Sequence, residues 1–224
     1  MVIASLIEEQ HEDLELIQNP YIELTFPVMG QSIPIDHGYQ LYSALKHRLM
    51  QLKDWDDISI KTISGKLDLA SRGGKANRDT RNQLNLTERS KLLIRLPSEK
   101  VPFVYSFSGK SLTIGKHKIR LGIPEMNFLQ SKSRLRSHIV VIRGYQDPDT
   151  FLKAANRQIE ALNISADIKL ICKKDSTPKP KTIKVKQTLV GFGIEANNLS
   201  ETDSIILQEK GLGGKQKMGC GVFV

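Results

Sequence analysis

The chain of 224 residues is 39% hydrophobic and 25% charged, which is the composition of a folded globular protein and does not favour an intrinsically disordered one. Its 33 Lys and Arg residues outnumber its 24 Asp and Glu residues, and the net charge of +9 favours a nucleic acid or another polyanion as partner. No run of roughly 18 apolar residues is present, so we expect no membrane-spanning helix and no membrane partner.

The N-terminal segment 1–20 is acidic and is expected to form a tail in front of the first domain. A secretion signal would begin with positive charge, so we expect a cytoplasmic protein. The two cysteines, Cys172 and Cys220, have no C-x-x-C spacing, and no cluster of histidines and carboxylates has the spacing of metal ligands. We therefore expect no metal site and no cofactor.

Residues 21–130 are predicted to form the first domain, in the order strand, helix, strand, strand, helix, strand. Alternating apolar residues indicate the strands, and leucines at helical spacing indicate a first helix of about fifteen residues with Asp36 as its N-cap. The predicted elements are strands at 21–28, 57–63 and 91–97, helices near 36–52 and 98–109, and a hairpin at 111–122. The polar, basic stretch 64–90 is predicted to be a long loop.

Residues 131–224 repeat this order and are predicted to form the second domain. The predicted elements are strands at 137–144, 166–172, 183–197 and 221–224, and helices at 147–164 and 199–211, the second capped near Ser200. Two such βαββαβ units predict an α+β fold of two tandem ferredoxin-like domains with a C-terminal glycine-rich loop. Such domains occur in proteins of unrelated function, so the fold alone assigns none.

Three segments carry a resemblance to a known family. They are PVMGQSIPIDHGYQLYSALKHR at 27–48, SRLRSHIVVIRG at 133–144 and GLGGKQKMGCGVF at 211–223. Together they resemble the RAMP superfamily of CRISPR systems and, within it, the sixth family of CRISPR-associated proteins, above all its MYXAN subtype. The resemblance covers nearly the whole chain from Tyr21 onward.

The resemblance implies a repeat-specific endoribonuclease that processes precursor crRNA without a metal. In that chemistry the ribose 2′-hydroxyl attacks the adjacent phosphate and leaves 2′,3′-cyclic phosphate and 5′-hydroxyl ends. The implied partners are CRISPR repeat RNA and crRNA, together with other CRISPR-associated proteins if the chain stays in an effector complex. The alternative is a non-catalytic RAMP-type subunit that binds crRNA in such a complex.

Cleavage of this kind needs a base near the 2′-hydroxyl, an acid near the leaving 5′-oxygen and positive charge at the phosphate. His37 follows Asp36 at the start of the first helix, where the helix dipole favours a neutral imidazole and a nearby phosphate. His47 falls on the helix face opposite the leucines and therefore points away from the core. Both are candidate catalytic residues, and Tyr39 is a candidate to hydrogen-bond the reacting groups.

The resemblance also places RNA contacts in the glycine-rich loop and at the start of the second domain. Glycines allow backbone N–H groups to approach a phosphate, and interleaved lysines add charge. The candidates are Gly211, Gly213, Gly214, Lys215, Lys217, Gly219, Gly221, Arg134 and Arg136. The loop lacks the G-x-x-x-x-G-K-[ST] spacing, which disfavours a nucleotide-binding loop. Basic runs within 72–89 and 173–181 are either RNA contacts or solvated loops, and His138 is expected to be structural.

Overall fold

The computed structural model describes residues 20–67, 83–172 and 177–224. The predicted tail at 1–20 and the predicted loop at 64–90 fall largely outside these ranges, as do Lys173 and Lys174. Among the described helices none is long and apolar enough to cross a membrane. Where residues 64–90 are described, they include the paired strands β4 (Lys66–Leu67) and β5 (Gln83–Asn85), so the prediction of one long loop is wrong there. The RNA contact weighed for its basic residues stays a prediction.

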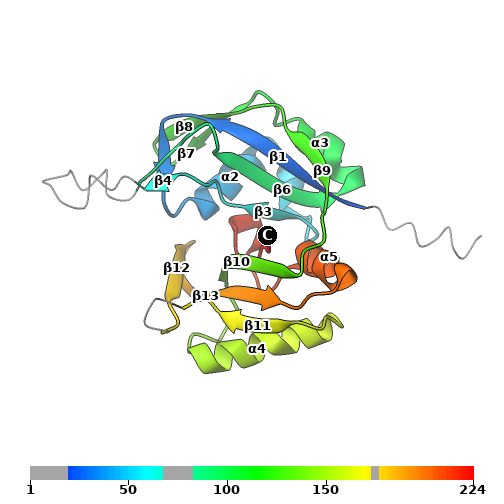
Figure 1. Ribbon diagram of the computed structural model, residues 1–224. Helices are drawn as coiled ribbons and strands as arrows, with labels where there is room; N and C mark the ends of the chain where they lie inside the picture. Colours follow the sequence, from blue (N-terminus) through cyan, green and yellow to red (C-terminus); the bar gives the residue numbers. More distant parts are fainter. Residues whose placement is uncertain (1–19, 68–82, 173–176) are drawn as a thin grey trace, which may run out of the picture.

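An antiparallel sheet with two helices on one face forms the N-terminal half (Figure 1). Its strands are, in spatial order, β3 (Ser59–Lys61), β6 (Lys91–Pro97), β1 (Tyr21–Met29), β8 (His117–Leu121) and β7 (Ser111–Ile114), and β9 (Glu125–Phe128) also pairs with β1. Helices α2 (Gly38–Arg48) and α3 (Val101–Tyr105) lie behind the sheet in Figure 1. A small sheet of β2 (Ser32–Pro34), β5 (Gln83–Asn85) and β4 (Lys66–Leu67) completes this half. The pairing of β1 with both β6 and β9 is the one that a ferredoxin-like unit requires.

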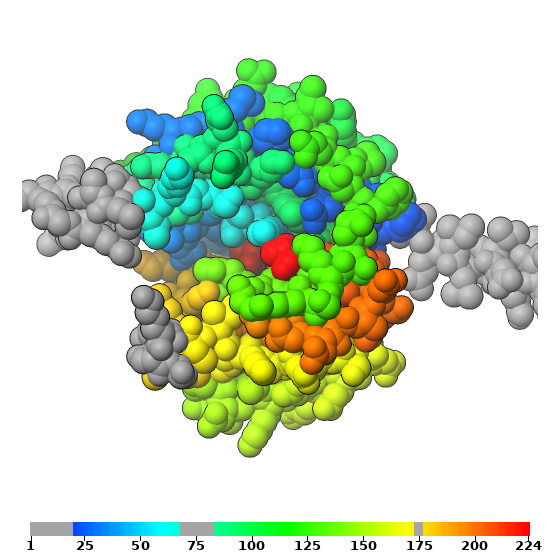
Figure 2. Space-filling view, in the orientation of Figure 1, coloured from blue at the N-terminus to red at the C-terminus, as the bar shows by residue number. Residues whose placement is uncertain are grey.

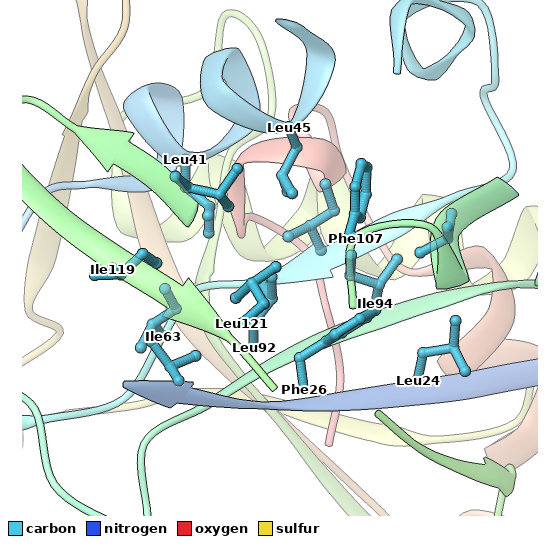
Figure 3. Close-up of a cluster of buried hydrophobic side chains, with 14 of the residues drawn as sticks. Leu24, Phe26, Leu41, Leu45, Ile63, Leu92, Ile94, Phe107, Ile119 and Leu121 are labelled. Atoms are coloured by element: carbon cyan, nitrogen blue, oxygen red, sulfur yellow. The ribbon is translucent and has the colours of Figure 1, made fainter. Parts of the chain in front are cut away.

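The leucines of α2 hold this helix on the sheet. Figure 3 shows Leu41 and Leu45 pointing from α2 toward the strands that carry Phe26 and Leu121, and all four side chains are 0% exposed. Burial of one leucine side chain contributes about 1.5–3 kcal/mol, so this stripe fixes which face of the helix is inward. The opposite, polar face of α2 is thereby left toward solvent.

The start and the length of α2 differ from the prediction. The N-cap is His37, without a side-chain cap, whereas the Asp36 carboxylate accepts a hydrogen bond from the Lys184 N–H at 2.7 Å. The prediction of Asp36 as the cap is therefore wrong, because this carboxylate is used by a strand of the other half. The helix also stops after 11 residues, since Leu49 is extended and a 3-10 turn follows at Met50–Lys53.

The C-terminal half repeats the plan with its own sheet and helices (Figure 1). Its elements are β10 (Arg134–Val140), α4 (Pro148–Ala161), β11 (Asp167–Leu170), β12 (Pro180–Lys184), β13 (Thr188–Asn197) and α5 (Glu201–Lys210). Strand β13 is central, with β10 on one side and β11 and β12 along the other. Asp147 and Ser200 cap α4 and α5 through side-chain oxygens, which confirms the predicted cap at Ser200. In place of a regular last strand, Val224 exchanges two backbone hydrogen bonds with Arg136, at 2.9 and 3.0 Å.

Two separate hydrophobic cores support the two halves, one drawn from residues 22–121 and one from residues 135–223. The α+β class with two ferredoxin-like units is therefore confirmed, and we keep the division at 130/131 as the proposed domain boundary. Figure 2 shows the last residues of the chain in the seam between the halves. There the buried Arg95 of β6 donates to the carbonyl oxygens of Gln208 and Phe223, at 2.8 and 2.9 Å, and to Glu23 Oε2 at 2.8 Å.

Candidate functional site

The glycine-rich segment 211–221 packs against the N-terminal half. A Cβ atom at Gly38, the first residue of α2, would come within 2.2 Å of the Met218 carbonyl oxygen. A Cβ atom at Gly219 would lie 2.4 Å from Thr62 Cγ2, and Gly219 also has a φ of 88°, which favours glycine. The glycines thus bring the backbone of this segment into direct contact with the start of α2.

The backbone N–H groups of the five predicted glycines are all used inside the protein. In chain order, the acceptors for Gly211, Gly213, Gly214, Gly219 and Gly221 are Leu207 O, Gln158 Oε1, Val141 O, Gln216 O and Ile139 O, at 2.7 to 3.2 Å. A backbone amide has a single hydrogen, so in this conformation none of the five is free for a phosphate. The predicted phosphate contacts of these N–H groups are therefore corrected to contacts within the fold.

The two lysines of the segment have different surroundings. Lys217 Nζ donates to the carbonyl oxygens of Leu52 and Lys53, at 3.2 and 2.9 Å, and lies 3.6 Å from Asp56 Oδ1. It therefore anchors the segment to the 3-10 turn after α2, so its charge is used within the fold and not for the RNA contact that the sequence suggested. Lys215 is exposed, and it alone of the two remains placed for an anionic ligand.

His37 is 1% exposed and both of its ring nitrogens are bonded within the fold. Nδ1 lies 2.8 Å from the Pro34 carbonyl oxygen, and Nε2 accepts the Ile63 N–H at 3.0 Å, so these partners assign the proton to Nδ1. Burial lowers the pKa of His37, which favours the neutral ring. As folded, this ring offers no proton donor or acceptor to an RNA, which contradicts the direct contact that the sequence favoured.

His47 lies in a hollow of about 400 Å³ between the polar face of α2 and β7. Tyr39, Ser43 and His47 recur every four residues along that face, so the helix stacks them on one side. Arg48 completes the hollow and donates to the Ser111 carbonyl oxygen at 3.0 Å. Among the described residues that line the hollow none is acidic, so its charge is positive.

The hollow runs along the polar face of α2 from Tyr39 to Arg48, whereas the glycine-rich segment contacts the helix at Gly38 and, through Lys217, the 3-10 turn that follows it. The segment packs on Gly38, and His47 follows nine residues later, which at 1.5 Å per residue is roughly 14 Å along the helix axis. Tyr39 and His47 thus line the same hollow, whereas His37 is not among the residues that line it. The structure places the glycine-rich segment as a support for the first turn of α2.

Arg134 and Arg136 are exposed on alternate positions of β10, as the sequence suggested for RNA contacts. Both guanidinium groups lie 2.5 Å from Glu195 Oε2 on the adjacent strand β13. Because two cations share one carboxylate, a net positive charge remains on this face of the C-terminal sheet. The pKa of Glu195 is lowered, first of all by its hydrogen bond from Arg134, so the carboxylate stays ionised.

A family model described as "Cas6 Crispr" matches residues 22–224. The chain belongs to the Cas6 family. Its similarity to the CRISPR-associated endonuclease Cas6 of Myxococcus xanthus is 30% identity over 205 residues, which cover 91% of this chain and 81% of that one. This agrees with the resemblance expected from the three sequence segments.

Solved Cas6 structures share the fold. A structure described as a CRISPR-associated protein Cas6 has a TM-score of 0.58 at 12% identity and covers 91% of this chain and 98% of its own. The product of a Cas6-related gene from Pyrococcus furiosus has a TM-score of 0.59 at 16% identity, with coverage of 92% and 97%. At such identities the likeness establishes the arrangement of two ferredoxin-like domains.

Two arginines of this Cas6 chain were not among the residues that the sequence singled out. Arg48 directly follows His47 and lies four residues after Ala44 on the polar side of α2, so the helical spacing could have pointed to it. Arg95 could not have been found this way, since it sits in an apolar strand and its partners are 113 and 128 residues away.

Proposed function

We propose that this protein is a CRISPR endoribonuclease that cleaves repeat RNA in precursor crRNA. The observation that carries the proposal is the hollow on α2, which an exposed histidine, a tyrosine and an arginine line within a Cas6 fold. The relative from Myxococcus xanthus, described as a CRISPR-associated endonuclease, supports the same activity. The net charge of +9 fits a polyanionic substrate.

The residues of the hollow match the needs of attack by a 2′-hydroxyl. We assign to His47 the removal of the 2′-hydroxyl proton while the oxygen bonds to phosphorus and the bond from phosphorus to the 5′-oxygen breaks. Arg48 is suited to stabilise the charge that develops on the phosphate, because its planar guanidinium donates to two oxygens at once. Tyr39 supplies a hydroxyl that can donate to the phosphate or to the departing 5′-oxygen. The departing 5′-oxygen takes up a proton from solvent water, so the products are a 2′,3′-cyclic phosphate and a 5′-hydroxyl.

The roles proposed for the other sequence candidates follow from their surroundings. Arg134, Arg136 and Lys215 are exposed cations, and we propose that they bind the RNA backbone. His37 and the glycines of segment 211–221 are proposed to hold the start of α2 in place. Other CRISPR-associated proteins are proposed as partners if the product stays bound after cleavage.

The test uses a stem-loop repeat RNA in buffer that contains EDTA. Cleavage is expected without added metal, and a 2′-deoxy sugar at the cut site should abolish it because the nucleophile is missing. The H47A variant is expected to lower the single-turnover rate by about 10²- to 10⁴-fold, which is typical for loss of a general base. His117→Ala is the matched control, since His117 lies outside the hollow and contacts Ser32 Oγ. Wild-type rates in the His47 variant would contradict the assignment.

One observation favours a second function, a non-catalytic subunit that binds crRNA. Among the described residues that line the hollow there is one histidine, and His37 is engaged in the core, so within the described part of the chain the hollow supplies one imidazole for two proton transfers. Tight binding of the repeat RNA with no cleavage by the wild-type protein would establish this alternative.

A further inference from the structure

Lys181 reaches across the C-terminal sheet to a strand that it does not pair with. Its own strand β12 pairs with β13, where Lys181 is opposite Gly191. Its ammonium group nevertheless donates to the His138 carbonyl oxygen on β10 at 2.7 Å and lies 3.1 Å from His138 Nδ1. Because β13 lies between β12 and β10, the lysine side chain spans a whole strand.

Two glycines of β13 make this crossing possible. A Cβ atom at Gly193 would lie 3.1 Å from the His138 carbonyl oxygen, the same atom that accepts the hydrogen bond from Lys181. A Cβ atom at Gly191 would lie 2.1 Å from the Val140 carbonyl oxygen, so this position has no room for a larger residue, and the fit at Gly193 would be tight. At these two glycines β13 has no side chain that would block the path of the Lys181 side chain.

The cluster carries positive charge without a matching carboxylate. Burial and the nearby Lys179 lower the pKa of Lys181, and burial followed by Lys181 and Lys179 lowers the pKa of His138. In the part of the chain that the structure describes, no carboxylate forms an ion pair with Lys181, and Glu195 is shared by Arg134 and Arg136. The Lys181 ammonium donates to Nδ1 of His138, so the hydrogen of the neutral imidazole is assigned to Nε2. From there it can donate a hydrogen bond to an anion.

We propose that Lys181 and His138, together with Arg136, form a phosphate-binding site for the RNA backbone, separate from the cleavage hollow. The proposal rests on the function proposed above and specifies where the RNA is held outside the reacting nucleotides. Arg134, Arg136 and His138 alternate along one face of β10, about 6.6 Å apart. A row of cations fits a chain of phosphates better than a single small anion.

The test measures the affinity for a fluorescein-labelled stem-loop repeat RNA with a 2′-deoxy cut site, so that cleavage plays no part. Lys181→Ala is expected to weaken binding about tenfold and to reduce the slope of log affinity against log salt by about 0.7 to 0.9. Gly193→Ala should weaken binding too, because it displaces the lysine without removing charge. Lys153→Ala on α4 is the matched control and should change neither quantity.

A second readout distinguishes a phosphate site from a purely structural contact. An RNA phosphate beside His138 raises the pKa of its imidazole, because opposite charge favours the protonated form. The proton NMR titration of His138 should therefore move to higher pH with RNA and should stay unchanged with inorganic phosphate at equal concentration.

The proposal is overturned if Lys181→Ala binds the RNA like the wild type or if the His138 titration does not move. These outcomes are independent of catalysis. If the wild-type protein binds the repeat RNA but does not cleave an RNA with an intact 2′-hydroxyl, the phosphate-binding site is supported and the proposed nuclease function is contradicted. If the wild-type protein cleaves the repeat RNA while Lys181→Ala binds it with wild-type affinity, the nuclease function is supported and the phosphate-binding site is contradicted.

Discussion

His37 and His47 begin and nearly end the same helix, yet their environments assign them opposite tasks. His37 is enclosed and bonded through both nitrogens, whereas His47 is exposed in a hollow with Tyr39 and Arg48. A buried imidazole with two fixed partners stabilises the fold in one protonation state. An exposed imidazole can exchange protons with a ligand, which general acid–base catalysis requires.

The stability of the fold is expected to fall in mild acid because of His37. Burial lowers its pKa in the folded state, so the unfolded chain binds the proton more readily. The free energy of unfolding should therefore decrease as pH falls from about 6.5 toward the folded-state pKa, with no further loss from this group below it. Urea denaturation at several pH values measures this, and His37→Gln, which does not titrate, should show a flatter profile. Equal slopes for both proteins would contradict the role.

Arg48 is expected to contribute to cleavage through its geometry as well as its charge. Arg48→Lys keeps one positive charge but loses the planar pair of donors, so we expect a loss of about tenfold to 10²-fold in single-turnover rate. Arg120→Lys on β8 is the matched control, since Arg120 is exposed and not part of the hollow. Unchanged cleavage by Arg48→Lys would show that the guanidinium does not act on the phosphate.

At the scale of elements, the glycine-rich segment supports α2. Its N–H groups are bonded within the fold, Lys217 is bound to the end of the 3-10 turn, and the Met218 carbonyl oxygen touches the position of Gly38. The segment thus contacts the helix that carries the hollow at Gly38 and, through Lys217, the turn that follows Arg48. A substitution in this segment is expected to lower the free energy of unfolding more than it lowers the affinity for RNA.

Two glycines of the segment are expected to respond very differently to alanine. Gly221 has a φ of 69°, and its Cβ atom would lie 1.9 Å from the Leu212 carbonyl oxygen, so Gly221→Ala should lower the free energy of unfolding by about 3 kcal/mol. A Cβ atom added at Gly214 would have no other atom within 4 Å, so Gly214→Ala should change the free energy of unfolding by less than about 0.5 kcal/mol. Urea denaturation compares the two, and similar losses would contradict the packing role.

At the scale of the whole molecule, most helices and strands could be predicted from the sequence, while the contacts between segments distant in the sequence could not. Strand alternation and the leucine stripe depend on neighbouring residues, so they indicated both βαββαβ units and the exposed side of His47. The burial of His37 depends on Ile63, and the crowding at Gly219 depends on Thr62, a contact between residues more than 150 positions apart. Such contacts have no local sequence signal, which is why these residues were first interpreted as ligands of RNA.

Arg95 is expected to make the two domains unfold together. Arg95→Met would leave the carbonyl oxygens of Gln208 and Phe223 unpaired and Glu23 without its cation, at a cost of about 3–5 kcal/mol. Fluorescence of Trp55, the single tryptophan, reports on the N-terminal domain, and far-ultraviolet circular dichroism reports on both. The two urea transitions should coincide in the wild type and separate in the variant. Coincident transitions in Arg95→Met would show that other contacts couple the domains.

The hydrogen bond from the Lys184 N–H to Asp36 joins strand β12 to the residue that precedes His37. Strand β12 also carries Lys181, and α2 carries His47, so one short connection links the proposed RNA-holding surface to the proposed cleavage residues. A shift of β12 upon RNA binding would therefore move the first turn of α2. We therefore expect occupancy of one domain and reactivity of the other to be energetically coupled through this connection.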